Sequence, residues 1–379
     1  GYAISGNAID KNVLNKLNIT KAEKIILMTG KDISNLEILD AIAKIIPETD
    51  KDKNIIKLYI HLESKENYEI LPSIKRVGIN IRAFSVYDNA AQTLFMKHPL
   101  GENVDTIDNG SVNLAIVGFD AAGLSVLYRA LALGHFFNGK PLNVTIFDNN
   151  HEKKRAEFLK LYPISLKAGG IINWNIDFKD DGELFNKDGI ENFNQIIFCK
   201  TNVQASLTDI ARIIKNQSAH LKNKQFFIFI DKHDGIKGIA NDIKIEDTDV
   251  IPFGDFSQIC SYDVVINEIY DTMAIRADQR YNDLHNYETN WDSLSPFLQD
   301  SNRMQVEHLP IKLKAINKLL SENKSLEYDE AKEKARNRWF DLELNGQKVS
   351  DIKKINLWDK IEGAKTLATY ISLDDIEKL

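Results

Sequence analysis

Residues 112–150 read VNLAIVGFDAAGLSVLYRALALGHFFNGKPLNVTIFDNN, and this stretch predicts the fold around it. Its apolar run Val112–Val117 ends at Gly118, and leucines at helical spacing follow. A second β-rich run, Asn143–Phe147, closes on Asp148. Strand, glycine turn, helix and strand in this order indicate a nucleotide-binding βαβ unit, in which backbone N–H groups at a helix N-terminus receive a phosphate.

The turn after the first strand, residues 118–123, reads GFDAAG and approximates the G-x-G-x-x-G pattern of dinucleotide sites. Asp120 takes the place of the middle glycine, where the backbone must approach a pyrophosphate most closely. Its bulk and negative charge disfavour NAD, so a different nucleotide, or a fold kept for structure, fits this turn better. Residues 200–202 follow another strand and face the same crevice by topology. The predicted ligand-binding residues here are Gly118, Asp120, Gly123, Asp148, Lys200, Thr201 and Asn202.

Residues 111–268 are predicted to form a complete Rossmann-like domain. Beyond Asp148, helical and strand patterns alternate, as six strands of a doubly wound parallel sheet require. The expected elements are helices at Glu152–Leu161 and Val203–Lys215, strands near Ile171–Ile176 and at Gln195–Cys199 and Gln225–Ile230, and a segment Val264–Tyr270 that leads out.

Composition limits the class of protein. The chain has 379 residues, enough for two or three domains, and carries a net charge of −7. No block of Lys and Arg stands out, so a nucleic-acid polymer is not expected as a partner, whereas a small anionic ligand is compatible. Cys199 and Cys260 lie in apolar runs and are predicted to be reduced thiols of a cytoplasmic protein. No apolar run approaches the roughly 18 residues of a membrane helix.

Residues 1–88 show a parallel α/β pattern of their own. Apolar runs and helical patterns alternate along them, with polar residues at the expected helix starts. The expected elements are a strand end at Gly1–Ser5, strands at Lys24–Met28, Ile55–Leu62 and Ile79–Phe84, helices capped by Asp10 and Ser34, and a short helix at Glu66–Leu71.

Residues 1–85 resemble the second half of the TrkA-type nucleotide-binding domain, the RCK domain of potassium channels and transporters. That family runs G-D-A-x-D, helix, strand, T-x-D-D-x-x-N, helix, and this chain has GNAID at 6–10 and TGKDISN at 29–35. Asn7 replaces the usual acid, and the first acid of the D-D pair is missing. The resemblance implies seven ligand-binding residues: Gly6, Asn7, Ala8, Thr29, Gly30, Asp32 and Asn35.

The first half of that domain is not found in this chain, and a parallel sheet cut at its middle would expose a strand edge and apolar faces. We therefore expect the missing half to lie upstream, to come from another chain, or to have been removed. Gly1 in place of Met fits a processed chain or a fragment. The resemblance also implies an upstream membrane pore.

Residues 89–110 are predicted to be a linker. Ala90–Met96 has the pattern of a helix. Two interpretations stay open: a crossover helix that swaps between subunits, and a simple interdomain helix.

Residues 269–379 are helical, aromatic and charged, without a strand pattern, and they resemble the ryanodine-receptor repeat. The most specific part is SNRMQ at 301–305, after WDSL at 291–294 and before Lys312-Leu313. In a second segment, Arg338-Trp339 and Gly346 match the family pattern, whereas Arg336-Asn337 replaces Glu-His. The resemblance implies a polar pocket formed by Trp291, Ser301, Asn302, Arg303, Gln305, Arg338 and Trp339.

Each of these residue types also has a structural interpretation. Ser301 can be a helix N-cap. Trp291 and Trp339 can stack on a base or fill a core. Arg338 can contact a phosphate or form a surface ion pair.

No convincing catalytic constellation or metal-ligand spacing is present, and His233-Asp234 is the best dyad available. The predicted fold class is therefore α/β, with one partial and one complete parallel sheet followed by a small all-α domain. We hypothesise a cytosolic ligand-sensing region of a prokaryotic ion channel or transport regulator, which binds a nucleotide or nucleotide-derived messenger as a dimer or tetramer. The alternatives are an NAD(P)-dependent oxidoreductase and a non-catalytic scaffold with vestigial Rossmann folds.

Overall fold

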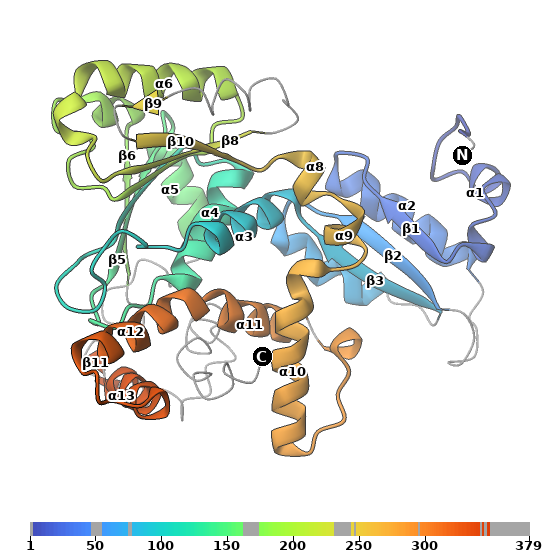
Figure 1. Cartoon of the computed structure of the whole chain (residues 1–379). Coiled ribbons are helices and arrows are strands. Elements are labelled where there is room, and N and C mark those ends of the chain that lie inside the picture. Colours follow the sequence, from blue (N-terminus) through green and yellow to red (C-terminus); the bar gives the residue numbers. More distant parts are fainter. Residues whose placement is uncertain are drawn as a thin grey trace. The chain divides into compact units, whose positions relative to one another are not determined.

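The computed structural model describes residues 3–46, 55–74, 78–161, 174–230, 244–245, 248–294, 296–341, 343–344 and 347–348 (Figure 1). The chain divides into two compact units. The first contains the residues up to Asn89 together with Phe256–Asn267, and the second contains Ala90–Asp255 and the chain from Glu268 onward. The architecture is α/β with two parallel sheets and C-terminal helices, as the sequence predicts.

The first unit is built on a three-stranded parallel sheet. Its strands are β1 (Lys24–Leu27), β2 (Ile56–His61) and β3 (Ile79–Phe84), in the order β1-β2-β3. Ile25 pairs with Leu58, and Leu58 pairs with Ile81. The three strands lie at the positions that their apolar runs predict.

Two α-helices and two 3₁₀ helices surround this sheet. Asp10 caps α1 (Lys11–Lys16) through the backbone N–H of Asn12, as predicted. The predicted cap at Ser34 is wrong, because α2 begins at Asp32 and Ser34 lies in its first turn. Residues 3–5 are not in a strand, so the strand end expected there is also wrong. The remaining elements are η1 (Ile19–Lys21), α2 (Asp32–Ile45) and η2 (Lys65–Ile74), the last at the predicted short helix.

Phe256–Asn267 belongs to the first unit although it follows the second sheet in the chain. It contains α8 (Phe256–Ile259) and α9 (Tyr262–Val265). The Tyr59 hydroxyl donates a 3.2 Å hydrogen bond to the carbonyl of Ile266, and Lys24 Nζ donates to the Tyr262 hydroxyl at 2.5 Å. The sequence pattern assigns this segment to the 111–268 domain and gives no sign of these distant contacts.

The second unit contains the complete sheet, and its strand order is that of a Rossmann fold. Six parallel strands lie in the order β6-β5-β4-β7-β8-β10, and the short β9 pairs antiparallel to β10 at one edge. Numbered along the chain, the parallel strands follow the doubly wound order 3-2-1-4-5-6. They are β4 (Asn113–Val117), β5 (Leu142–Phe147), β6 (Trp174–Lys179), β7 (Gln195–Phe198), β8 (Gln225–Phe229) and β10 (Thr248–Phe253), with β9 at Lys244–Ile245.

Two details of this sheet differ from the prediction. The third strand lies at Trp174–Lys179, shifted toward the C-terminus from the expected Ile171–Ile176. The sixth parallel strand is β10, which no sequence pattern singled out. Val264–Tyr270 contains no strand: it runs from the end of α9 through a turn into η5 (Ile269–Asp271). β10 contains Pro252 and is preceded by charged residues, so its apolar pattern is weak.

Among the described residues, five helices lie along the chain between the strands of the second sheet. They are α4 (Ala121–Leu133), α5 (His151–Leu161), η3 (Asp181–Phe185), α6 (Val203–Asn216) and η4 (Ser218–His220). The apolar face of α6 packs on the sheet, where Ile210 and Ile213 lie in one core with Ile196 and Phe226. All four of these side chains are fully buried, as expected for a parallel sheet covered by helices.

Four further helices follow Glu268 in the second unit. They are α10 (Thr272–His285), α11 (Pro296–Glu307), α12 (Leu309–Glu322) and α13 (Tyr328–Asp341), with the short η6 (Trp291–Ser293) before α11. A small antiparallel pair, β11 (Glu343–Leu344) and β12 (Gln347–Lys348), corrects the expectation that this region has no strands. The predicted linker helix is α3 (Val86–Lys97), which starts in the first unit and ends in the second.

None of the helices in the described part of the chain is both long and apolar enough to cross a bilayer.

Candidate functional site

The candidate site lies at the carboxyl edge of the second sheet, beside the central strands β4 and β7. β4 pairs with β5 on one side and with β7 on the other, so the strand order reverses at β4. Ligands of open α/β sheets bind outside the carboxyl ends of the strands at such a switch point. Gly118 follows β4 and Lys200 follows β7 closely, and a Cβ on Gly118 would lie 2.9 Å from the backbone nitrogen of Lys200. The structure therefore brings these two predicted residues together.

Both glycines of the turn are required by geometry. Gly118 has φ +90°, a left-handed conformation that side chains disfavour. A Cβ on Gly123 would lie 2.3 Å from the carbonyl oxygen of Gly118, so only glycine lets α4 start this close to β4. These are the tight-turn and close-packing roles of the first and third glycines of the dinucleotide pattern.

Asp148 lies at the end of β5, where an acid can hold a ribose hydroxyl, but its carboxylate is already used. One oxygen accepts a 2.9 Å hydrogen bond from the N–H of Phe119, and the other accepts a 2.8 Å bond from the N–H of Asn150. Asp148 is buried. Its carboxylate therefore fixes the shape of the glycine turn, and Phe119 packs edge-on against Phe178 behind the turn.

Asp120 is the N-cap residue of α4, yet its side chain makes no capping hydrogen bond. Instead its carboxylate pairs with Lys154 Nζ on α5 at 2.8 Å. Partial burial on its own lowers the pKa of Lys154, but the carboxylates of Asp120 and Asp148 outweigh this effect and raise it. The first turn of α4 is thus left without a side-chain cap, and the charge of Asp120 is neutralised by a neighbour.

Lys200 is the cation of the candidate site. Its ammonium lies 3.0 Å from a carboxylate oxygen of Asp181 and 2.7 Å from one of Asp209. Burial opposes the charge, yet the two carboxylates raise the pKa of Lys200, so it is charged at neutral pH. Asn202 caps α6 through the N–H of Ala205 at 3.3 Å, which is a structural role, and Thr201 is exposed.

In the first unit, the predicted residues Asn35 and Asp32 form hydrogen bonds to other segments of the chain at the carboxyl edge of the smaller sheet. Asn35 is fully buried; its Oδ1 accepts from the N–H and hydroxyl of Thr29 at 2.9 Å, and its Nδ2 donates to the carbonyl of His61 at 2.8 Å. The Asp32 carboxylate accepts from the backbone N–H groups of Glu63 and Ser64 and from Asn67 Nδ2. These contacts join the end of β1 to the segment after β2.

The other residues of that prediction have local roles. Gly30 has φ +82° in the turn after β1. Gly6, Asn7 and Ala8 lie in the turn before α1, where the Asn7 carbonyl accepts from the N–H of Asp10 and its Oδ1 accepts from the N–H of Ile9. Polar side chains of both motifs are thus bound to the chain's own backbone.

In the C-terminal helices, Arg303 is held by two acids. It donates to both Asp271 oxygens, at 2.6 and 2.5 Å, and to Asp300 at 2.9 Å. Its guanidinium also lies over the ring of Trp291, 5.5 Å from the centroid. Burial opposes the charge of Arg303, but the two carboxylates raise its pKa well above the ordinary value. Arg303 and Trp291 are therefore brought together, in a self-contained ion-pair cluster.

The remaining residues of the predicted pocket have separate local roles. Asn302 Nδ2 approaches Asp278 at 3.4 Å, and burial raises the pKa of that carboxyl. Ser301 lies inside α11, so the N-cap interpretation is wrong. The Gln305 carbonyl accepts from Lys312 Nζ at 3.3 Å. Arg338 reaches the carbonyl of Ile107, and the side chain of Trp339 lies outside the described residues.

A buried ion pair between α4 and α11 was missed by the sequence analysis. Arg129 Nη1 lies 2.8 and 2.7 Å from the two carboxylate oxygens of Glu307, and Gln92 Nε2 on α3 donates to the same carboxylate at 2.6 Å. Both charged side chains are at most 5% exposed. In the sequence, Arg129 lies inside the apolar run LYRALAL. A charged residue in such a run was the sequence signal for a buried ion pair.

Among the described residues, no group of three or more His, Cys, Asp or Glu side chains could hold a metal ion. His233 and Asp234 lie outside the described residues. Cys199 is buried, and burial raises the pKa of its thiol well above the ordinary value, which removes thiolate chemistry near neutral pH.

The chain matches no known protein-family model, and no curated protein is significantly similar to it. Of the predicted architecture, the structure shows the two parallel sheets and the C-terminal helical region.

Proposed function

We propose that this chain is a ligand-sensing regulatory region, in which a nucleotide or nucleotide-derived messenger binds at the carboxyl edge of the second sheet. The observation that carries the proposal is the glycine turn at the switch point of a Rossmann-ordered sheet, with Lys200 beside it. The first turn of α4 has no side-chain cap, so its backbone N–H groups and the helix dipole favour an anion there.

The internal ion pairs of this edge favour sensing over permanent cofactor binding. A phosphate that approaches Lys200 competes with Asp181 and Asp209, and one that approaches α4 lies near Asp120. Binding therefore exchanges one set of charge contacts for another. Such an exchange gives the bound and free states different contacts, which is what a ligand needs to shift a conformational equilibrium.

The setting of a prokaryotic ion channel or transport regulator rests on the resemblance of residues 1–85 to RCK domains and of residues 269–379 to ryanodine-receptor repeats. A homo-oligomer and an upstream membrane pore are part of the same proposal. The edge strand β1 supports it, because Ile26 in this strand and Met28 just after it are 52% and 39% exposed.

Isothermal titration calorimetry tests the ligand directly. The panel is ATP, ADP, AMP, NAD, NADH and cyclic mono- and dinucleotides, titrated into the wild-type chain and into Lys200→Met. We expect at least one member to bind the wild type and Lys200→Met to weaken it about tenfold or more, the size of one lost charge-assisted contact. Lys187→Met is the matched control, since Lys187 is exposed on the loop after η3. Absence of binding by every member contradicts the proposal.

The oxidoreductase alternative is favoured by the strand order and by Asp148 at the end of β5. Asp120→Gly completes the G-x-G-x-x-G pattern and removes a negative charge from the turn. If the chain is an NAD enzyme in which Asp120 is tolerated, wild type and Asp120→Gly both bind NADH and reduce or oxidise a substrate. Under the sensor proposal, Asp120→Gly gains NADH affinity and stays inactive.

The scaffold alternative is favoured by the same ion pairs, since Lys200 and Lys154 already have acidic partners. It predicts that Lys200→Met changes stability alone and that no nucleotide shifts the melting temperature.

A further inference from the structure

The segment that joins α3 to β4 is in contact with two other parts of the second unit. Residues 98–110, called the connector below, contact the first residues of β7 and β8: the Gly101 N–H donates to Gln195, and Gln225 donates to Glu102, both at 3.3 Å. The connector therefore lies at the amino edge of the sheet. The candidate ligand site lies at the carboxyl edge, so the two are at opposite ends of the same strands.

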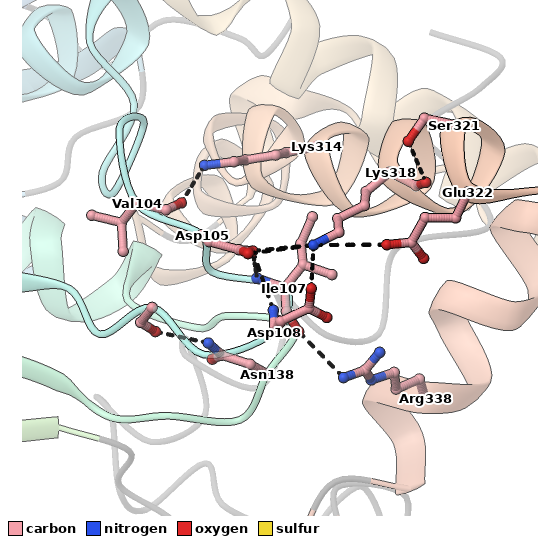
Figure 2. Close-up of polar contacts among 11 residues, drawn as sticks. Val104, Asp105, Ile107, Asp108, Asn138, Lys314, Lys318, Ser321, Glu322 and Arg338 are labelled. Atoms are coloured by element: carbon pink, nitrogen blue, oxygen red, sulfur yellow. Dashed lines mark hydrogen bonds and ion pairs between the residues drawn. The ribbon is translucent and has the colours of Figure 1, made fainter.

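Cationic side chains of α12 and α13 hold the connector from its other side (Figure 2). Lys314 Nζ donates to three backbone carbonyls, those of Gly101, Glu102 and Val104, at 3.1, 2.9 and 2.6 Å. Lys318 Nζ pairs with the carboxylates of Asp105 and Asp108. Each is a contact in which the donor is charged, the class of hydrogen bond that contributes most to stability.

Arg338 on α13 completes this set. Its Nη2 donates to the carbonyl of Ile107 at 3.3 Å, and its guanidinium lies 4.2 Å from the centroid of the Phe137 ring. Asp105 in turn accepts from the N–H groups of Ile107 and Asp108, which closes the loop on itself. These two backbone hydrogen bonds lower the pKa of Asp105 the most, and Lys318 lowers it further.

Helix α4 connects the two edges of the sheet. Its first residue follows the glycine turn of the candidate site, and its 13 residues span about 20 Å. Near its far end, Arg129 forms the buried pair with Glu307 of α11, and the carbonyl of His135 just beyond it accepts from His308 at 2.8 Å. α4 thus runs from the candidate ligand site to α11, the helix that precedes α12 in the chain.

We infer that α11–α13 form a latch on the connector, and that α4 transmits the state of the ligand site to this latch through Arg129 and Glu307. α3, whose Gln92 binds the same Glu307, runs from the first unit into the second and leads directly into the connector. A displacement of α4 therefore changes the contacts of the element that the two units share. The transmission step rests on the proposed function, whereas the latch itself does not.

Hydrogen–deuterium exchange of the ligand-free, full chain tests the latch. Lys314→Met is expected to raise exchange across residues 98–110 about tenfold, because three carbonyls lose their charged donor. Lys318→Met, at a more exposed position, gives a smaller rise in the same peptides. Lys324→Met is the control, since Lys324 is exposed beyond the end of α12. Unchanged exchange in the double variant Lys314→Met/Lys318→Met overturns the inference, as does an equal rise in Lys324→Met.

Glu307→Gln tests the link to α4, because it removes the charge of the pair and keeps its size. The Glu307 carboxylate is bonded to Arg129 and Gln92, whereas Lys314 and Lys318 hold the connector. We expect connector exchange to rise in Glu307→Gln by more than exchange at β8, whereas a uniform rise, or none in the connector, contradicts transmission. This experiment uses no nucleotide, so its failure is distinct from a failure of the calorimetric panel.

Discussion

The two parallel sheets use the polar residues at their carboxyl edges in different ways. In the first sheet, Asn35 and Asp32 form four bonds of 3.0 Å or shorter to backbone groups of the chain. In the second, Lys200 and Asp120 bond to other charged side chains, beside a helix start with no side-chain cap. Backbone bonds are replaced only by unfolding, whereas ion pairs can be exchanged for a ligand. This difference is the reason for proposing the ligand site at the second sheet.

The sheets also differ at their edges. β6, an edge strand of the second sheet, buries Trp174 and Phe178 and exposes Asn175, and β9 at the other edge has two residues. β1 of the first sheet exposes Ile26 instead. Polar side chains and short strands protect an edge from further pairing, and an exposed isoleucine does not. We therefore propose β1 as the edge at which another strand adds to the first sheet.

The largest effect is expected at the buried ion pair of the second unit. Arg129→Met leaves the Glu307 carboxylate buried without its cation and should lower the free energy of unfolding by about 3–5 kcal/mol. Tryptophan fluorescence in a denaturant titration reports it, since Trp174 and Trp291 lie in this unit and are buried. A loss below about 1 kcal/mol contradicts the pair's role.

The same variant makes stability depend on pH. Burial raises the pKa of Glu307, and Arg129 opposes this shift in the wild type. A carboxyl with a raised pKa in the folded state contributes stability below its unfolded pKa, and the contribution is lost as pH rises through the folded pKa. Arg129→Met should therefore be more stable at pH 5 than at pH 8, by a larger margin than the wild type. The double variant Arg129→Met/Glu307→Met should lose this added dependence.

In the first unit, Asn35→Ala should cost about 2–3 kcal/mol. It leaves the partly buried N–H of Thr29 and the buried carbonyl of His61 without their partner. The chain has four tryptophans, at 174, 291, 339 and 358, so fluorescence does not report this unit. Hydrogen exchange in β1 and β2 is the measurement, with the exposed Asn15→Ala as control. Exchange equal to that of the control refutes a structural role for Asn35.

The smallest effect on stability is expected at the open edge. Ile26→Lys should change the free energy of unfolding by less than about 0.5 kcal/mol, because Ile26 is already half exposed. It should reduce self-association measured by sedimentation velocity, if β1 is the edge at which copies of the chain meet. Ile33→Lys, at a position 63% exposed in the first turn of α2, separates an edge effect from a loss of apolar surface.

The sequence predicted the elements whose signals are local. The run before Gly118, the apolar strands β1–β3 and the cap at Asp10 follow from periodicity and capping chemistry, and all are confirmed. β10 was missed because Pro252 and charged neighbours weaken its pattern. The place of Phe256–Asn267 in the first unit depends on Tyr59 and Lys24, more than 200 residues away, so no local pattern reveals it.

The candidate site was only partly predicted, because some of its features are local in the sequence and others depend on distant residues. The spacing of Gly118 and Gly123 indicates a tight turn, and the structure shows the close approaches that require them. The partners of Lys200 come from η3 and α6, and those of Arg303 from η5 and α11, which only the folded chain brings together. Sequence identified which residues carry charge, whereas their neutralisation is a property of the fold.

Hydrogen exchange with and without a nucleotide tests the contrast between the two carboxyl edges most directly. With the tightest binder of the calorimetric panel, we predict slower exchange at residues 118–124 and 199–206 of the second unit and no change at residues 29–35 of the first. Protection at residues 29–35 without protection at the glycine turn of the second sheet would contradict the account.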